Sequence, residues 1–215
     1  MRKSFISIIL CVVCFGMSGC IDIFQNITRD TNGIDYNTIR ITVSKTVLAM
    51  ANSLSNSSDI DYEKLFDESD LNNLDMNDYN QYGATVSKVN DMMDIGYLIE
   101  MSINNSDRNT ADLINRSNVN FIPKYANNVV SIPIDFLNGN YSSTDDSSMA
   151  AAFLATGKYR LLISKKCAPN ISKVIIKANN GETEISFLNL YDSYLIEVPL
   201  PLLMVSAVDL LIYLM

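Results

Sequence analysis

Residues 21–43 read IDIFQNITRDTNGIDYNTIRITV, and this stretch decides the fold. Isoleucines alternate with more polar residues over Ile21–Ile27, and the same alternation returns over Tyr36–Val43. A period of two residues is typical of a strand with one buried face. The dipeptide Asn32-Gly33 between them suits the positive φ angles of a tight turn. We therefore predict that the two strands pair as a hairpin.

Similar strand patterns recur along the rest of the chain. They lie at Tyr82–Val89, Ile95–Ile103, Val119–Tyr125, Val129–Phe136, Tyr159–Ser164, Ile171–Ala178, Glu182–Leu190 and Tyr194–Val198. Pro123 and Pro133 restrict two of these strands to sheet edges, strand ends or bulges, because proline cannot donate a ladder hydrogen bond. Asn180-Gly181 marks another tight turn.

Helical patterns separate the pairs of strands. The first begins at Ser44, after which one helical face carries Val47, Met50, Ala51 and Leu54. Others are expected over residues 59–78, 107–116 and 144–157. We therefore predict an α+β domain at residues 20–199, in which an antiparallel sheet built from hairpins has helices packed on one face.

The final segment, Leu200–Met215, is almost entirely apolar and follows the strand-ending Pro199. Its 16 residues are fewer than the ~20 that span a bilayer as a helix, and Asp209 near the middle would be costly there. We predict a separate helix, either docked on the protein or lying at a membrane interface.

The first residues have the organisation of an export signal. Arg2 and Lys3 precede the apolar run Phe5–Phe15, and small residues precede Cys20. Met17-Ser18-Gly19-Cys20 resembles the lipobox of bacterial lipoproteins, in which cleavage before the cysteine exposes a thiol that carries diacylglycerol and palmitate. The alternative is a plain secretory signal with Cys20 as a spare thiol. We expect a signal peptide at residues 1–19 and a lipid anchor on Cys20.

Composition excludes several classes of function. The formal net charge is −8, which argues against nucleic-acid binding because phosphate neutralisation needs a basic surface. Histidine is absent, so the commonest general base and metal ligand are missing. The acidic stretch at residues 59–78 lacks the glycine and closing glutamate of a calcium loop. We expect a protein that is not an enzyme and has no metal or cofactor.

Basic residues concentrate between Ser147 and Gly181, where no acidic residue occurs. The candidate contacts to anionic lipid headgroups are Lys158, Arg160, Lys173 and Lys177. On the strand from Ile171, the last two project to the same side as Ile171 and Ile175 and so predict a mixed apolar and basic face. The alternative is that these residues complement the acidic stretch or are simply exposed.

Three stretches of the mature sequence resemble LppM-like lipoproteins, which also occur among uncharacterised spirochaete proteins. These stretches are Cys20-Ile21-Asp22-Ile23, Asp30-Thr31-Asn32-Gly33 with the strand Ile39–Val43, and the late hairpin Ala178–Phe187. The resemblance implies an α+β domain with lipid-binding character, and a C-terminal membrane helix of which Leu200–Met215 would be a shortened counterpart. It carries no catalytic residues.

Together these observations predict an exported, membrane-anchored lipoprotein of the bacterial cell envelope. Its expected partners are membrane lipid through acylated Cys20 and a lipid ligand or another envelope component. The alternative function is a structural or surface-exposed lipoprotein that binds other proteins or a host. An apolar groove would favour lipid binding, whereas a filled core with an exposed apolar patch would favour protein binding.

Overall fold

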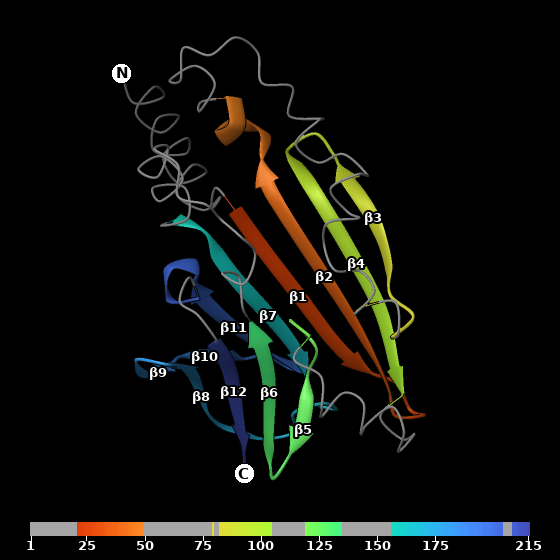
Figure 1. Ribbon diagram of the computed structural model, residues 1–215. Helices are drawn as coiled ribbons and strands as arrows, with labels where there is room; N and C mark the ends of the chain where they lie inside the picture. Colours follow the sequence, from red (N-terminus) through yellow and green to blue (C-terminus); the bar gives the residue numbers. More distant parts are fainter. Residues whose placement is uncertain (1–20, 50–78, 80–81, 105–118, 135–155, 204–207) are drawn as a thin grey trace, which may run out of the picture.

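The computed structural model describes residues 21–49, 79, 82–104, 119–134, 156–203 and 208–215. These residues form two β-sheets that share one hydrophobic core (Figure 1). The predicted α+β class with helices on one face of a sheet is therefore wrong, since the fold is mostly β. In the described part of the chain no helix is long and apolar enough to cross a bilayer.

The larger sheet has seven strands in the order β10-β11-β7-β1-β2-β4-β3. The bounds of its strands are β1 (Ile21–Arg29), β2 (Ile34–Ser44), β3 (Thr85–Asn90), β4 (Asp94–Asn104), β7 (Lys158–Ser164), β10 (Phe187–Asn189) and β11 (Ser193–Pro199). The hairpin predicted from residues 21–43 is confirmed, with Ile21 opposite Val43 and Gly33 at a φ of 83°. However, β1 and β7 are parallel, so the sheet is mixed and not purely antiparallel.

The smaller sheet has five strands in the order β5-β6-β12-β8-β9, all antiparallel. Its strands are β5 (Lys124–Ala126), β6 (Val129–Ile134), β8 (Ile171–Ala178), β9 (Gly181–Ile185) and β12 (Val208–Leu214). Asn127 and Asn128 both have positive φ in the β5–β6 turn, as a two-residue hairpin loop requires. This sheet, and not a layer of helices, covers the inner face of β1, β7 and β11.

Burial follows the alternation that the sequence predicts. On β4, the predicted face of Ile95, Tyr97, Ile99, Met101 and Ile103 is buried throughout. Alternation shows that one side of a strand is buried, but it does not show whether a helix or a second sheet buries it. The hairpins β5–β6 and β8–β9 therefore looked like parts of a single sheet, although they belong to the second one.

The predicted C-terminal helix is also wrong. Pro199 ends β11, residues Leu200–Leu202 form one 3₁₀ turn (η2), and β12 is the central strand of the smaller sheet. Val208, Leu210 and Ile212 point into the core, while Asp209 lies opposite Lys177 on the outer side. A continuous apolar run fits a buried strand as well as a helix, which is why its periodicity misled.

The position of β12 gives a stability prediction. We expect Ile212→Ala to lower the free energy of unfolding by about 2–5 kcal/mol, because it leaves a cavity at a fully buried position in the central strand. Met215→Ala, at an exposed position three residues later, is the control and should change it by less than about 0.5 kcal/mol. Urea unfolding of both variants checks this, and equal effects would contradict the assignment of β12 to the core.

Candidate functional site

The four basic residues predicted to contact headgroups lie on opposite outer faces of the sandwich. Lys158 and Arg160 are on β7 of the larger sheet, whereas Lys173 and Lys177 are on β8 of the smaller one. The structure therefore does not bring them together into one basic surface. Contact with lipid headgroups stays a prediction for each pair separately.

Arg160 is matched by two carboxylates. Its guanidinium lies 2.6 Å from both oxygens of Asp22 and 2.9 Å from Oε1 of Glu197, and Lys158 Nζ lies 4.0 Å from Oε2 of the same glutamate. Burial raises the pKa of Asp22, and the neighbouring Arg160 partly offsets this effect. These ion pairs join β1, β7 and β11. Contacts within the sheet are therefore enough to explain why Lys158 and Arg160 are basic.

On the other outer face, the predicted mixture of apolar and basic side chains is present. Lys173 lies over the ring of Tyr213 at 4.7 Å, Lys177 is opposite Asp209, and the buried Ile175 lies between the two lysines on the same side. Ile171 instead belongs to the core, because the pairing register shifts near the end of β12.

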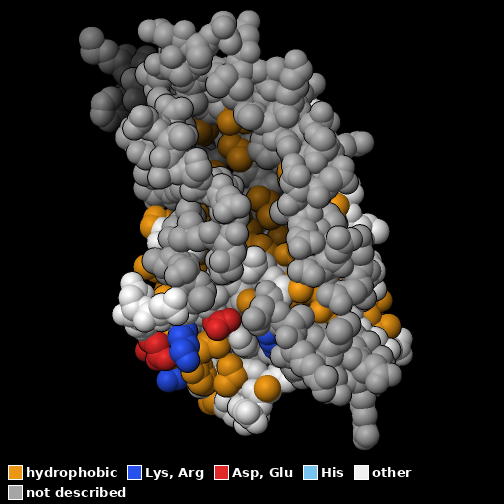
Figure 2. Space-filling model, viewed as in Figure 1, with side chains coloured by type: hydrophobic (Ala, Val, Ile, Leu, Met, Phe, Trp, Pro, Cys, Tyr) orange, Lys and Arg blue, Asp and Glu red, His pale blue; other side chains and the backbone are white. Residues whose placement is uncertain are grey.

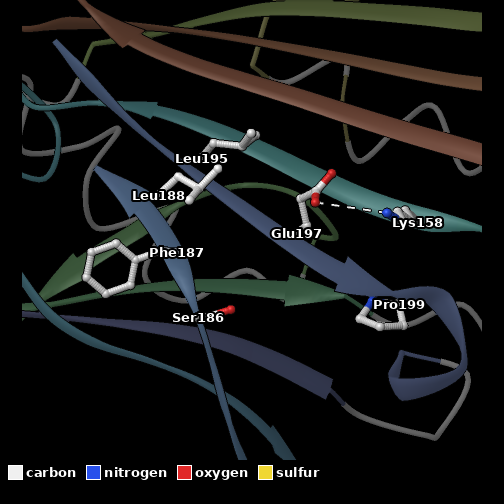
Figure 3. Close-up of a pocket in the computed structure, with 7 residues that line it drawn as sticks. All are labelled: Lys158, Ser186, Phe187, Leu188, Leu195, Glu197 and Pro199. Carbon is white, nitrogen blue, oxygen red and sulfur yellow. Dashed lines mark ion pairs between the residues drawn. The ribbon is translucent and has the colours of Figure 1, made fainter. Parts of the chain in front are cut away.

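A groove of about 340 Å³ runs along the outer face of β7, β11 and β10 (Figure 3). Its lining residues are Lys158, Ser186, Phe187, Leu188, Leu195, Glu197 and Pro199. Leu188 and Leu195 are opposite each other on neighbouring strands, and the ion pair of Lys158 and Glu197 lies at one side. The groove combines this leucine pair with the polar side chains of Lys158, Ser186 and Glu197, and its lining residues form no acid–base or nucleophile arrangement.

The inner face of the larger sheet holds a second candidate site. Figure 2 shows hydrophobic side chains of the described residues on the viewed face. Inward-facing side chains at the start of β1 and the end of β2 are half-buried; they are Ile21, Ile41 and Val43. Toward the other end of the same strands, Ile27 and Ile39 are fully buried. Ile21, Ile41 and Val43 are thus less buried than their neighbours Ile23 and Ile95 at the same end of this face.

A buried polar network, which the sequence analysis missed, lies deeper on this inner face. Gln25 Nε2 donates to Asn37 Oδ1 at 2.8 Å and to the carbonyl oxygen of Phe121 at 2.7 Å. Asn37 Nδ2 donates to the same carbonyl oxygen at 2.9 Å, and the Tyr159 hydroxyl donates to Gln25 Oε1 at 2.5 Å. Gln25 and Asn37 stand at inward positions of strands whose other inward residues are mostly isoleucines. These two polar residues in an apolar pattern were the signal in the sequence that could have predicted the network.

An ion pair continues the network toward the far end of the strands. Asp35 is fully buried and accepts from Arg29, whose guanidinium also lies 4.8 Å from the centre of the Tyr125 ring. The thiol of Cys167 approaches Asp35 Oδ1 at 3.8 Å. Cys167 is buried, and this burial raises the pKa of its thiol and disfavours the reactive thiolate.

Other predicted sites fall outside the described residues. Cys20 directly precedes the first described residue, Ile21, and the acidic stretch at residues 59–78 is likewise not described. Within the described ranges, no group of three or more histidine, cysteine or carboxylate residues could hold a metal ion.

Comparisons with known proteins give one distant structural relation. No protein family model and no curated protein matches the chain. Among solved structures, the chain is similar to the NMR structure of the folded domain of LppM from Mycobacterium tuberculosis, with 11% sequence identity and a TM-score of 0.38. The match covers 91% of this chain and 90% of that chain. A likeness this distant says nothing about function, and the resemblance found in the sequence is supported to that extent alone.

The polar network predicts coupled effects of substitution. We expect Gln25→Leu to lower the free energy of unfolding by about 1–3 kcal/mol, because the Tyr159 hydroxyl and Asn37 lose a buried partner. Combining Gln25→Leu with Tyr159→Phe should cost less than the sum of the single changes, by about 0.5–3 kcal/mol. A double-mutant cycle by urea unfolding measures this, and strict additivity would show that the two side chains do not interact.

Proposed function

We propose that this chain is an exported lipoprotein of the bacterial cell envelope, anchored through acylated Cys20, and that its β-sandwich binds lipid without catalysing a reaction. The observation that carries the proposal is the half-buried apolar floor formed by Ile21, Ile41 and Val43. This floor lies at the end of the sandwich where Cys20 joins β1.

The anchor is supported by sequence and by chain connectivity. Positive charge, an apolar run, small residues and a cysteine occur in the order that an acylated export signal requires. Because Ile21 is already the first residue of β1, an acylated Cys20 would leave no flexible spacer between lipid and sandwich. Two or three acyl chains would hold the protein permanently, since each buried methylene contributes ~0.8 kcal/mol.

Lipid binding is supported by the chemistry of the inner face. An acyl chain needs an apolar surface that is concave, partly open and free of unpaired charge. The half-buried inward side chains at this end are all aliphatic, whereas the buried polar network occupies the deeper half of the same face. An acyl chain bound on this floor would therefore not have to displace the hydrogen bonds of Gln25 and Asn37.

Substitution of the proposed anchor residue tests export and acylation. We expect Cys20→Ser to release the protein from membranes into the aqueous phase. The Cys20 thiol is the nucleophile that follows the small-residue cleavage site, and serine cannot form the thioether to the lipid. Detergent partitioning and intact-mass measurement of both forms check this. A membrane fraction unchanged by the substitution, or a wild-type mass without acyl groups, would contradict the anchor.

Native mass spectrometry of the full chain carrying Cys20→Ser tests lipid binding, because any retained lipid is then noncovalent. We expect copurifying lipid, and Ile41→Gln should weaken its binding about fivefold, since a polar group on an apolar floor costs about 1 kcal/mol. Tyr36→Gln changes an exposed residue of the same strand that lies on the outer face, and it should leave binding unchanged. Absence of lipid, or equal losses in both variants, would contradict the proposal.

A second candidate function, protein binding, is favoured by exposed apolar side chains at the opposite end of the larger sheet. In and beside the β10–β11 turn, Leu188 and Leu190 are exposed and Tyr191 is 99% exposed. A photo-crosslinking residue at position 191 should then capture an envelope protein in intact cells, whereas the same residue at position 36 should not.

A further inference from the structure

The β3–β4 turn carries two exposed methionines that no proposed role yet explains. Met92 is 85% exposed and Met93 is 61% exposed, and the turn joins Asn90 at the end of β3 to Asp94 at the start of β4. Two adjacent methionine side chains exposed to water on a hairpin tip are unfavourable. Burying them in another apolar phase would recover hydrophobic free energy.

The turn is held in one conformation by hydrogen bonds. Asp91 Oδ1 accepts from the backbone N–H groups of Met93 at 2.9 Å and Asp94 at 2.8 Å, and these bonds lower the pKa of Asp91. Arg40 donates to Asp91 Oδ2 at 2.8 Å. The Lys45 ammonium donates to Asn90 Oδ1 at 2.6 Å and its backbone N–H to the Met93 carbonyl at 2.8 Å.

Strand register places this tip at the same end of the sandwich as Cys20. Ile21 is opposite Val43, Val43 is opposite Ile95, and Ser44 is opposite Asp94. The tip is therefore level with the first residue of β1 and about 10 Å to its side, which is the width of two strand spacings. Consecutive Cα atoms are about 3.8 Å apart, so Cys20 must lie close to Ile21. A membrane that holds acylated Cys20 would therefore lie beside both methionines.

We propose that Met92 and Met93 insert into the interface of the lipid bilayer to which Cys20 is anchored, as a second, noncovalent contact that fixes the tilt of the sandwich. This inference rests on the proposed anchor, because the anchor specifies which end of the molecule faces lipid. The aspartate-centred hydrogen bonds preorganise the turn, so little conformational entropy is lost when it enters the interface. The half-buried Ile21, Ile41 and Val43 lie at the same end of the sandwich.

The test compares two exposed turns at opposite ends of the larger sheet. The acylated full chain carries Met92→Cys or, as the matched control, Tyr191→Cys, each labelled with an environment-sensitive fluorophore; the buried Cys167 is shielded from the reagent. The protein is reconstituted into phosphatidylcholine–phosphatidylglycerol vesicles that contain nitroxide-labelled lipid. We expect blue-shifted emission and quenching at position 92 and neither at position 191. Equal signals at the two positions, or no quenching at position 92, would overturn the proposal.

An unacylated arm separates this inference from the anchor. If intact-mass measurement shows no acyl group, the anchor fails, and the full chain with Cys20→Ser then decides the role of the tip by vesicle cosedimentation. We expect the pair Met92→Ser and Met93→Ser to lower partitioning about tenfold, and the control pair Leu190→Ser and Tyr191→Ser to leave it unchanged. A parent chain that does not cosediment, or tip variants that cosediment like the parent, would overturn the tip proposal.

Discussion

The backbone of Phe121 joins the two sheets, and the alignment of the sandwich depends on this link. Its carbonyl oxygen accepts from Gln25 and Asn37 of the larger sheet, while its N–H donates to the Pro133 carbonyl oxygen of β6 at 2.8 Å. Phe121 reaches both partners with a φ of 62°, which costs a residue with a side chain about 1–2 kcal/mol. Such a conformation persists because several buried hydrogen bonds require it. Apolar packing alone would let two sheets slide, whereas these directional bonds fix one alignment.

The inner face of the larger sheet consequently divides along the strands. At one end, buried amides and the pair of Arg29 and Asp35 fill the space between sheets and need every partner they have. At the other end, Ile21, Ile41 and Val43 are aliphatic and half-buried, while the inward Tyr97 opposite Ile41 is buried. Opening the polar end would leave buried donors unpaired, whereas exposing Ile21, Ile41 and Val43 costs hydrophobic area. We therefore propose the end next to Cys20 as the one at which the sandwich admits an acyl chain.

Much of the strand content could be predicted from the sequence, because alternation and Asn-Gly turns are local signals. The hairpin of β1 and β2 and the buried face of β4 follow from them directly. The layer that covers this face is a long-range property: β12 reads as a helix until it is seen between β6 and β8. Gln25 and Asn37 were missed for the same reason, since their partner Phe121 is far away in the chain. Register, which no local pattern contains, is what places Met92 beside the start of β1.

The charge distribution bears on how such a protein could attach to a membrane. The chain is acidic, with a net charge of −8, so an anionic bilayer repels it as a whole at distances within a Debye length. The four basic residues predicted to contact headgroups are divided between two outer faces, and Arg160 is already matched by Asp22 and Glu197. Electrostatic attraction is therefore a weak source of affinity here. Attachment would instead come from buried apolar area, which acyl chains, methionines at a rigid tip and an open aliphatic floor all supply at one end of the molecule.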